Sequence, residues 1–360
     1  MSLSVPIVGA VRGRGARSNR SGRFEADQRE DFDDGWAEGE PAPPRRDTTL
    51  TAEAARVILT RNDSPDIGFD RSINPYRGCE HGCIYCYARP SHAYLGLSPG
   101  LDFETRLYFK PDAAQLLERE LGKPGYRPAR VQLGANTDPY QPIEKRLRIT
   151  RAVIEVLARF NHPLGVTTKS VLVARDLDLL APMAALNLVV VAVSVTTLDR
   201  KLARAMEPRA STPERRLDAI RQLSAAGVPV IVGASPMIPG LNDHELEAIL
   251  ERAAEAGAVG AYYTSLRLPL EIKDLFREWL AAEQPNRAAR VMSLVRQMRG
   301  GKDYDAAWGK RMRGEGPIGD LLSRRFRLAR RRFGLERPLA PLDLTLFRPP
   351  PRAGDQLTLL

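Results

Sequence analysis

Short apolar runs alternate with amphipathic stretches between about residues 68 and 285 of the chain. The runs are rich in Val, Ile and Thr, a composition typical of strands buried in a parallel sheet. The stretches between them repeat their apolar positions with the period of a helix. The pattern predicts strands near residues 69–75, 130–136, 164–169, 188–197, 228–235 and 260–267, and helices over residues 113–122, 146–160, 214–227 and 244–257.

Polar residues, proline and glycine mark where several of these helices begin or end. Thr212 followed by Pro213 predicts an N-cap with proline at the first helical position. Asn242 with Glu245 fits a capping box, and Gly227 fits a left-handed helix stop. Six βα units in series predict a parallel sheet with right-handed crossovers. We expect an α/β fold, a partial (β/α)6 TIM-type barrel, and a doubly wound sheet is the alternative that the pattern leaves open.

The two ends of the chain differ from this repeating part. Residues 1–48 begin with an Arg/Gly/Ser run, turn acidic and end in PAPPRR, so few large apolar residues could offset the entropy lost on ordering. We therefore expect a disordered charged arm over 1–48 and the barrel over 49–285. A helical basic C-terminal extension is predicted over 286–345, and a flexible tail over 346–360.

The net charge of the chain is +10, and much of it is concentrated near the C-terminus. Between Arg296 and Arg332 there are twelve basic and four acidic residues. Such a segment favours an anionic partner, nucleic acid first, although a solvated helix face explains it equally well. No apolar stretch approaches the ~18 residues of a membrane span, and the arginine-rich N-terminus does not fit a secretory signal. We expect a cytoplasmic protein with no membrane partner.

The three cysteines of the chain, Cys79, Cys83 and Cys86, lie within eight residues of one another. A disulfide framework needs an even number of dispersed cysteines, so the group predicts a metal site. Thiolates spaced Cys-x3-Cys-x2-Cys on one loop can hold three corners of a cubane iron–sulfur cluster. The fourth iron then has no protein ligand, and such an open position is typical of a reactive metal site. That iron could chelate the amino and carboxylate groups of S-adenosylmethionine.

A closed zinc site is the alternative for the same cysteines. Three Cys with His81 or His92 could complete a tetrahedral zinc site. His81 lies between two of the cysteines, where simultaneous chelation would be cramped, and the paired Cys-x2-Cys knuckles of zinc ribbons are absent. The corresponding function is a zinc-stabilised nucleic-acid-binding protein that uses the arginine-rich arm and the basic residues 324–332.

The cysteine motif, with an aromatic residue before its last cysteine, resembles that of the radical S-adenosylmethionine (radical SAM) superfamily. Further phrases along residues 68–285 are similar to the spore photoproduct lyase-like group of that superfamily. These phrases are INPYRGCEHGCIYCYAR, TDPYQPIE, TTKS, VSVTTLD, EPRASTPERRLDAIRQL and SPMIPGLND. The cysteine motif is highly specific for the superfamily, and the other phrases are moderately specific for the group.

The resemblance implies a shared opening reaction. An electron from a donor such as flavodoxin or ferredoxin enters a 4Fe–4S cluster, and S-adenosylmethionine is cleaved reductively. A 5′-deoxyadenosyl radical then abstracts hydrogen from a substrate. The protein contributes the cluster potential, the orientation of the cofactor and the exclusion of solvent.

The resemblance also suggests cofactor-binding residues at the strand ends. Tyr85 corresponds to the residue whose backbone meets the adenine amino group, and Ile238 lies in the adenine-contacting stretch, which departs from the family pattern at Pro236 and Asp243. The other positions are Asn136 and Asp138 near the methionyl amino group, Lys169, Ser194 and Thr196 at later strand ends, and Arg209 for the methionyl carboxylate. Turn formation, ordinary strand packing or a surface ion pair would explain these residues without any cofactor.

No catalytic residue is assigned by this reasoning. Spore photoproduct lyases use a further cysteine as a late hydrogen donor, and this chain has no fourth cysteine. Either Tyr87 or Tyr140 replaces it or the substrate differs, and we favour a different substrate. Nucleic acid and another polypeptide are both open as the molecule attacked.

Overall fold

The computed structural model describes residues 13–25 and 47–351 and places six parallel strands in one sheet. These strands are β3 (Arg71–Ile73), β6 (Val131–Leu133), β7 (Leu164–Thr168), β8 (Val189–Ser194), β9 (Val230–Met237) and β10 (Gly260–Ser265). A seventh strand, β2 (Leu59–Arg61), pairs antiparallel with β3 at the edge. The six strands predicted from the sequence are confirmed, each within two residues of its expected start.

The order of the strands decides between the two sheets that the sequence allows. From β3 to β10 the strands pair in chain order, with no reversal. A doubly wound sheet reverses its order at a switch point, whereas a barrel winds in one direction. The expected partial (β/α)6 TIM-type arrangement is therefore confirmed, with an open sheet.

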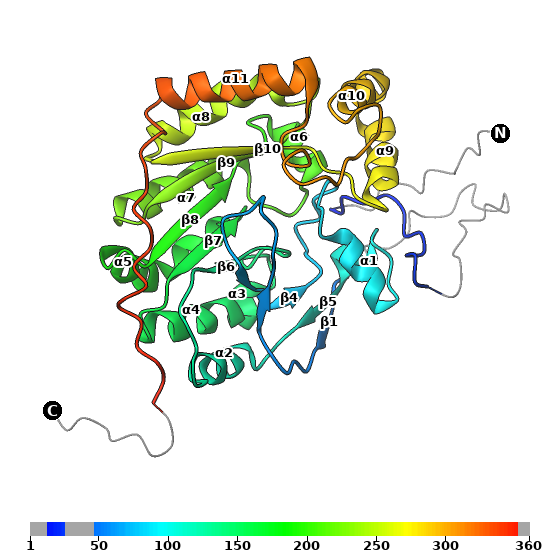
Figure 1. The fold of residues 1–360 in the computed structure, drawn as a ribbon. Coiled ribbons are helices and arrows are strands. Elements are labelled where there is room, and N and C mark those ends of the chain that lie inside the picture. Colours follow the sequence, from blue (N-terminus) through cyan, green and yellow to red (C-terminus); the bar gives the residue numbers. More distant parts are fainter. Residues whose placement is uncertain (1–12, 26–46, 352–360) are drawn as a thin grey trace.

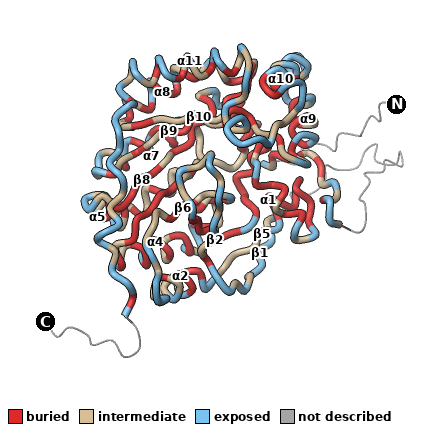
Figure 2. Tube along the Cα trace, in the orientation of Figure 1, coloured by how far each residue is buried: buried red, intermediate tan, exposed pale blue. Residues whose placement is uncertain are grey.

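Helices α2 (Ala113–Leu121), α4 (Ile149–Arg159), α5 (Leu177–Ala185), α7 (Pro213–Ala225) and α8 (Leu246–Glu255) follow successive strands and cover the outer face of the sheet (Figure 1). In Figure 2 the buried residues follow the strands, and the exposed ones follow the outer sides of the helices. Thr212 caps α7 by accepting a hydrogen bond from the Arg215 amide, and Gly227 ends that helical region with a φ of 78°. Both predicted helix signals are confirmed.

Two local predictions differ from the structure. The predicted helix over 146–160 is split into α3 (Glu144–Leu147) and α4 at Arg148, whose φ is 54°. The Glu144 carboxylate accepts a hydrogen bond from the Thr150 amide at 2.9 Å. It thereby provides a partner for one of the backbone N–H groups that the first turn of α4 leaves free. The predicted capping box at Asn242 is wrong. The Asn242 side chain instead accepts a hydrogen bond from the Ile238 amide and donates to the carbonyl oxygens of Thr196 and Pro236.

A second, three-stranded sheet lies beside the barrel. It consists of β1 (Thr49–Ala52), β5 (Arg106–Phe109) and β4 (Tyr76–Arg77). Short helical segments connect the larger elements: η1 (Arg89–Leu95), α1 (Asp102–Thr105), η2 (Val171–Asp176), α6 (Arg200–Met206) and η3 (Asp243–Glu245).

The C-terminal helices are α9 (Ile272–Glu283), α10 (Pro285–Gln297) and α11 (Gly316–Arg332). Leu322, Phe326 and Ala329 bury one side of α11 against the barrel, and Arg325 pairs with Glu247 of α8 at 2.6 Å. The opposite side of α11 is exposed and basic. It carries Arg324, Arg327, Arg331 and Arg332.

Parts of both predicted disordered ends have a defined place in the structure. Residues 13–25 lie against α1 and α9 (Figure 1), which differs from the expectation for 1–48. Phe347 packs on Tyr126 and His162, and the Arg348 amide donates to the Phe160 carbonyl at 3.0 Å. Residues 1–12, 26–46 and 352–360 lie outside the described residues. Within the described part of the chain, no helix has the length and apolarity to cross a bilayer.

His162 is a buried histidine whose charge state links folding to pH. Its Nε2 pairs with the Tyr126 hydroxyl at 2.8 Å, and its Nδ1 pairs with the Pro163 carbonyl at 3.1 Å. Burial lowers the pKa of His162 from 6.5 to about 4. Between pH 6.5 and about 4, His162 is protonated in the unfolded chain but not in the folded chain. The free energy of unfolding therefore falls as the pH drops from 6.5 to 4.

We predict that His162→Gln weakens this acid destabilisation, by at most about 3 kcal/mol across that window. Burial also lowers the pKa of His92 to about 4, so part of the acid dependence persists in the variant. Denaturant unfolding between pH 4 and 7 measures the effect, with the exposed His244→Gln as control. An unchanged pH dependence in His162→Gln would contradict the assignment.

Candidate functional site

The three cysteines lie on one loop that follows β4 and reaches the ends of the parallel strands. Cys79 and Cys83 are buried, Cys86 is half-buried, and all three are free thiols. Two tight turns shape the loop: the Gly82 amide donates to the Cys79 carbonyl, and the Cys86 amide donates to the Cys83 carbonyl. The loop also requires glycine at position 82. Its φ is 67°, and a Cβ there would lie 2.7 Å from the Glu104 carboxylate.

Arg89 braces the inside of this loop and is fully buried. Its guanidinium donates to the carbonyl oxygens of Cys83, Gly82, Pro99 and Gly100 and to the Glu104 carboxylate. Five hydrogen bonds use the five N–H donors of an arginine side chain. The backbone that carries Cys83 is therefore fixed by a buried charge with a complete set of partners.

The N-terminal segment 13–25 closes the outer side of the loop. The Gly15 and Ala16 amides donate to the Glu104 carboxylate at 2.9 and 2.8 Å. A Cβ at Gly15 would lie 1.9 Å from the Gly82 carbonyl oxygen, so only glycine fits there. Ion pairs then fix the rest of the segment to α9 and to the loop that precedes it, and these are Arg17–Glu283, Arg20–Glu278 and Arg23–Glu271.

The chemistry of the donor set fits an iron–sulfur cluster. Burial raises the pKa of the Cys79 and Cys83 thiols well above the ordinary value, and neighbouring acidic groups and thiols add to the effect. Thiolates in this loop therefore need a cationic group to stabilise them, as a metal cluster would.

The histidines of the zinc alternative have other partners. His81 pairs with the Asp138 carboxylate at 3.3 Å, and the His92 Nε2 pairs with the Arg106 carbonyl at 2.9 Å. Among residues 13–25 and 47–351, no three His, Cys, Asp or Glu side chains are grouped to hold a single metal ion, and this applies to the three cysteines as well. The contact between His81 and Asp138 is therefore what weighs against a closed zinc site with His81, whereas the His92 Nδ1 is buried without a partner.

Asp138 organises the strand ends beside the cysteine loop. One carboxylate oxygen accepts the Thr168 hydroxyl at 2.7 Å and the Tyr140 amide at 2.9 Å. The other accepts the Lys169 amide at 2.7 Å and faces His81. Burial alone would raise the pKa of Asp138, but His81 and these hydrogen bonds hold it at about 2. The carboxylate is thus ionised and fully occupied within the protein.

A second buried carboxylate, Glu207, holds Tyr85. Glu207 accepts hydrogen bonds from the Tyr85 hydroxyl and from Thr196, and it pairs with Arg216. Burial raises the pKa of Glu207 despite the opposing charge of Arg216. The Lys169 Nζ lies 5.8 Å from the centre of the Tyr85 ring and forms no hydrogen bond or ion pair with any residue of the described ranges.

The remaining predicted contacts differ in how accessible they are. Asn136 is exposed, and the Ser194 hydroxyl is buried and donates to the Ser235 carbonyl at 3.1 Å. Arg209 pairs at 3.0 Å with Glu80, a buried residue of the cysteine loop, so this ion pair is not the surface pair that the sequence allowed as an alternative. Ile238 is buried in the same apolar cluster as Cys83 and Tyr85.

The roles of several residues of this site have no local signal in the sequence. Arg89 and Glu207 lie in phrases that carry the family resemblance, but their partners, like those of Glu104 and the segment near Gly15, are brought together only by the fold. Only the glycine-rich start of the chain, RGRGARS, hinted at a close backbone approach.

Tyr87, directly after Cys86, lies beside the cysteine loop. Its hydroxyl donates to the Ala135 carbonyl, and 44% of its surface is exposed. Desolvation raises the pKa of its hydroxyl to about 12. Tyr140, the other candidate hydrogen donor, is completely buried.

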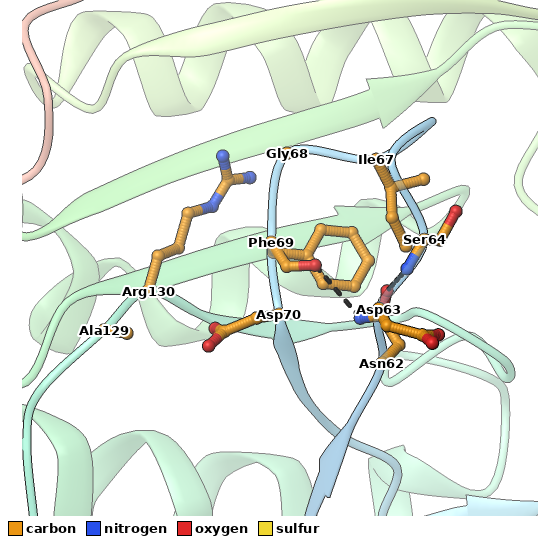
Figure 3. Close-up of a pocket in the computed structure, with 9 residues that line it drawn as sticks. All are labelled: Asn62, Asp63, Ser64, Ile67, Gly68, Phe69, Asp70, Ala129 and Arg130. Atoms are coloured by element: carbon orange, nitrogen blue, oxygen red, sulfur yellow. Dashed lines mark hydrogen bonds between the residues drawn. The ribbon is translucent and has the colours of Figure 1, made fainter. Parts of the chain in front are cut away.

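A hollow of about 460 Å³ lies between the turn of residues 62–70 and Arg130, which directly precedes β6 (Figure 3). None of the predicted cofactor contacts lines it.

Comparison with known proteins supports the interpretation of the cysteine loop. The family model described as Radical SAM superfamily matches residues 73–253. The chain belongs to the radical SAM superfamily. Uncharacterized proteins of Mycobacterium bovis and Mycobacterium tuberculosis are 40% identical to it over 231 residues, which is 64% of this chain and 68% of theirs. An uncharacterized protein of Methanocaldococcus jannaschii is 28% identical over 48% of this chain and 62% of its own length.

Solved radical SAM structures share the fold. A spore photoproduct lyase mutant superposes with a TM-score of 0.58 at 16% identity, covering 85% of this chain and 87% of the lyase. Spore photoproduct lyase complexed with dinucleoside spore photoproduct gives 0.55 at 17% identity and 79% of each chain. This radical SAM chain is therefore an enzyme of that class, with the expected partial barrel.

We predict that Arg89→Lys lowers the iron content of anaerobically purified protein severalfold. A lysine has three donors on one nitrogen and cannot bind four carbonyls and a carboxylate, so the Cys83 backbone loses its support. Iron per chain and absorbance near 400 nm measure the loss. Arg252→Lys on the outer side of α8 is the control. A folded Arg89→Lys protein with full iron content would show that Arg89 does not support the cysteine loop.

We predict that Gly15→Val exposes the cysteine loop. The valine cannot coexist with the Gly82 carbonyl, so the N-terminal segment must leave its place. In metal-free protein, Cys83 should then react with iodoacetamide several times faster, as followed by mass spectrometry. Gly68→Val, at a site with open space around its Cβ, provides the control. Equal rates in all three proteins would count against the closing role.

Proposed function

We propose that this radical SAM enzyme binds a 4Fe–4S cluster through Cys79, Cys83 and Cys86 and cleaves S-adenosylmethionine reductively. The observation that carries the proposal is a group of three free thiols, two buried and one half-buried, on one loop at the strand ends of a radical SAM family member. Held by the three cysteines, the cluster would pass one electron to S-adenosylmethionine, and this would supply the radical chemistry by which hydrogen is taken from a substrate. A reductant such as flavodoxin or ferredoxin is the electron donor.

The structure supports different roles for the predicted cofactor residues. Lys169 offers an ammonium group without an acceptor above the Tyr85 ring, and so it is our choice for the methionyl carboxylate. Asp138 and Thr196 have their polar atoms occupied by protein partners. They position Lys169 and Tyr85 rather than contact the cofactor.

The other predicted contacts fit less direct roles. Ile238, in the apolar cluster of Cys83, provides a wall that suits the adenine ring, with the Tyr85 backbone at its edge. Asn136 is exposed at the mouth and is free to approach the methionyl amino group. Ser194 and Arg209 contribute to the walls, since each already has a partner. For the domain limits, we propose that residues 13–25 join the barrel unit of 49–285.

The substrate side of the proposal rests on Tyr87. It is 44% exposed, whereas Tyr140 is fully buried, so Tyr87 is our choice for a tyrosine that exchanges hydrogen with a substrate. Nucleic acid is one substrate class that we propose, because a fold relative binds a dinucleoside photoproduct and α11 exposes a row of arginines. The chain has no fourth cysteine, so a thiol outside the cysteine loop is not available in it to donate the final hydrogen atom.

We predict that reduced wild-type protein releases 5′-deoxyadenosine from S-adenosylmethionine, slowly even without substrate. Cys83→Ala removes one of three thiolates and should lower this release at least a hundredfold, with loss of the brown colour. Chromatography of the products measures release, and Arg252→Ala is the control. Wild-type release by Cys83→Ala, or a colourless wild-type protein with stoichiometric zinc, would refute the proposal.

A further inference from the structure

Arg267 lies at the mouth of the barrel, two residues after β10 ends at Ser265. Its guanidinium lies 4.8 Å from the centre of the Tyr87 ring, and Tyr87 follows the cysteine Cys86 directly. Side chains at the carboxyl ends of barrel strands form the active site in this architecture. Arg267 therefore lies at the carboxyl ends of the strands, beside the cysteine loop.

The donors of Arg267 have no oxygen acceptor within the described ranges. Its Nε is buried without a partner, and its Nη1 reaches only the sulfur of Met312, at 3.7 Å. Asp66 is the carboxylate of this region, but it is taken by Arg311 and by the Gly309 amide at 2.7 Å. Arg267 is partly buried, but its Nε is shielded from water without an acceptor, and an anionic ligand would satisfy that donor.

Other arginines of the described residues have more oxygen partners. Arg299, near the same mouth, donates to three carbonyl oxygens, and Arg89 and Arg216 each have a carboxylate partner. Arg71 and Arg130 also have an unpartnered Nε, but Arg71 donates to the Arg127 carbonyl, and Arg130, which directly precedes β6, donates through its Nη2 to Gln132 at 2.8 Å. Within the described residues, Arg267 is thus an arginine beside the cysteine loop without an oxygen acceptor.

We propose that Arg267 binds an oxyanion of the substrate, a phosphate or a carboxylate group, beside the Tyr87 ring. This inference rests on the proposed function, because it names the chemistry of the molecule that the radical attacks. A planar guanidinium binds either group in a fork, and stacking on Tyr87 fixes its plane. The bound oxyanion would hold the substrate next to the cysteine loop.

The test is a thermal unfolding titration of the full-length, cluster-loaded protein with inorganic phosphate or with acetate, at constant ionic strength. A ligand that binds only the folded state raises the midpoint in a saturable way. We expect wild-type protein to respond to one of the two anions, and the one that acts identifies the phosphate or the carboxylate class. In Arg267→Gln the apparent dissociation constant should rise at least tenfold.

Two further variants keep the test decisive. Arg267→Lys preserves the charge and should bind the anion with intermediate affinity, and it serves if the Gln variant does not fold. Arg130→Gln should leave the affinity unchanged, because Arg130 lies at the other strand ends. Equal affinity in wild type and both Arg267 variants, an equal loss in Arg130→Gln, or no response of wild type to either anion would overturn the inference. Failure of 5′-deoxyadenosine release would instead refute the proposed function, since the anion titration involves no cleavage.

Discussion

The buried ion pair between Arg89 and Glu104 is the interaction on which the cysteine loop depends. It lies at the meeting point of three chain segments, namely the loop itself, the turn before α1 and the N-terminal residues 13–25. Removing two charges from water is costly, and the cost is offset only when every donor and acceptor finds a partner. Arg89 uses all five of its N–H groups, and both Glu104 oxygens accept backbone amides. The pair therefore fixes backbone geometry rather than simply adding attraction.

The same pair explains why a segment of low hydrophobicity is ordered. Residues 13–25 have few apolar side chains, and composition alone predicts that they cannot offset the entropy of folding. Their order comes instead from polar complementarity: two backbone amides bind Glu104, and three arginines pair with glutamates of α9 and of the loop before it. Glycine at position 15 permits a backbone approach that any side chain would block.

The sequence predicts the barrel well because the signals of the strands are local. Apolar runs gave the six strands, and the Thr212–Pro213 and Gly227 punctuation gave the limits of α7. The split at Arg148 and the inward role of Asn242 depend on buried partners from elsewhere in the chain, Glu144 for the first and the Thr196 carbonyl for the second.

The residues of the candidate site also differ in whether a local pattern or a distant partner defines them. The cysteine spacing and the polar strand ends are local patterns, so Lys169 and Asp138 could be named from the sequence. Glu207, Glu104 and Arg89 could not, because their partners come from segments that the fold alone brings together.

The distribution of charge at the mouth follows from these contacts. The carboxylates there, Asp138 and Glu207, are fully hydrogen-bonded and buried, so their oxygens are not available to a ligand. The cations Lys169 and Arg267 have no carboxylate partner in the described part of the chain. Because these carboxylates accept hydrogen bonds from the protein while the two cations have no carboxylate partner, the mouth favours anionic ligands. We propose the carboxylate of the cofactor as the partner of Lys169, near Tyr85, and an oxyanion of the substrate as the partner of Arg267, beside Tyr87.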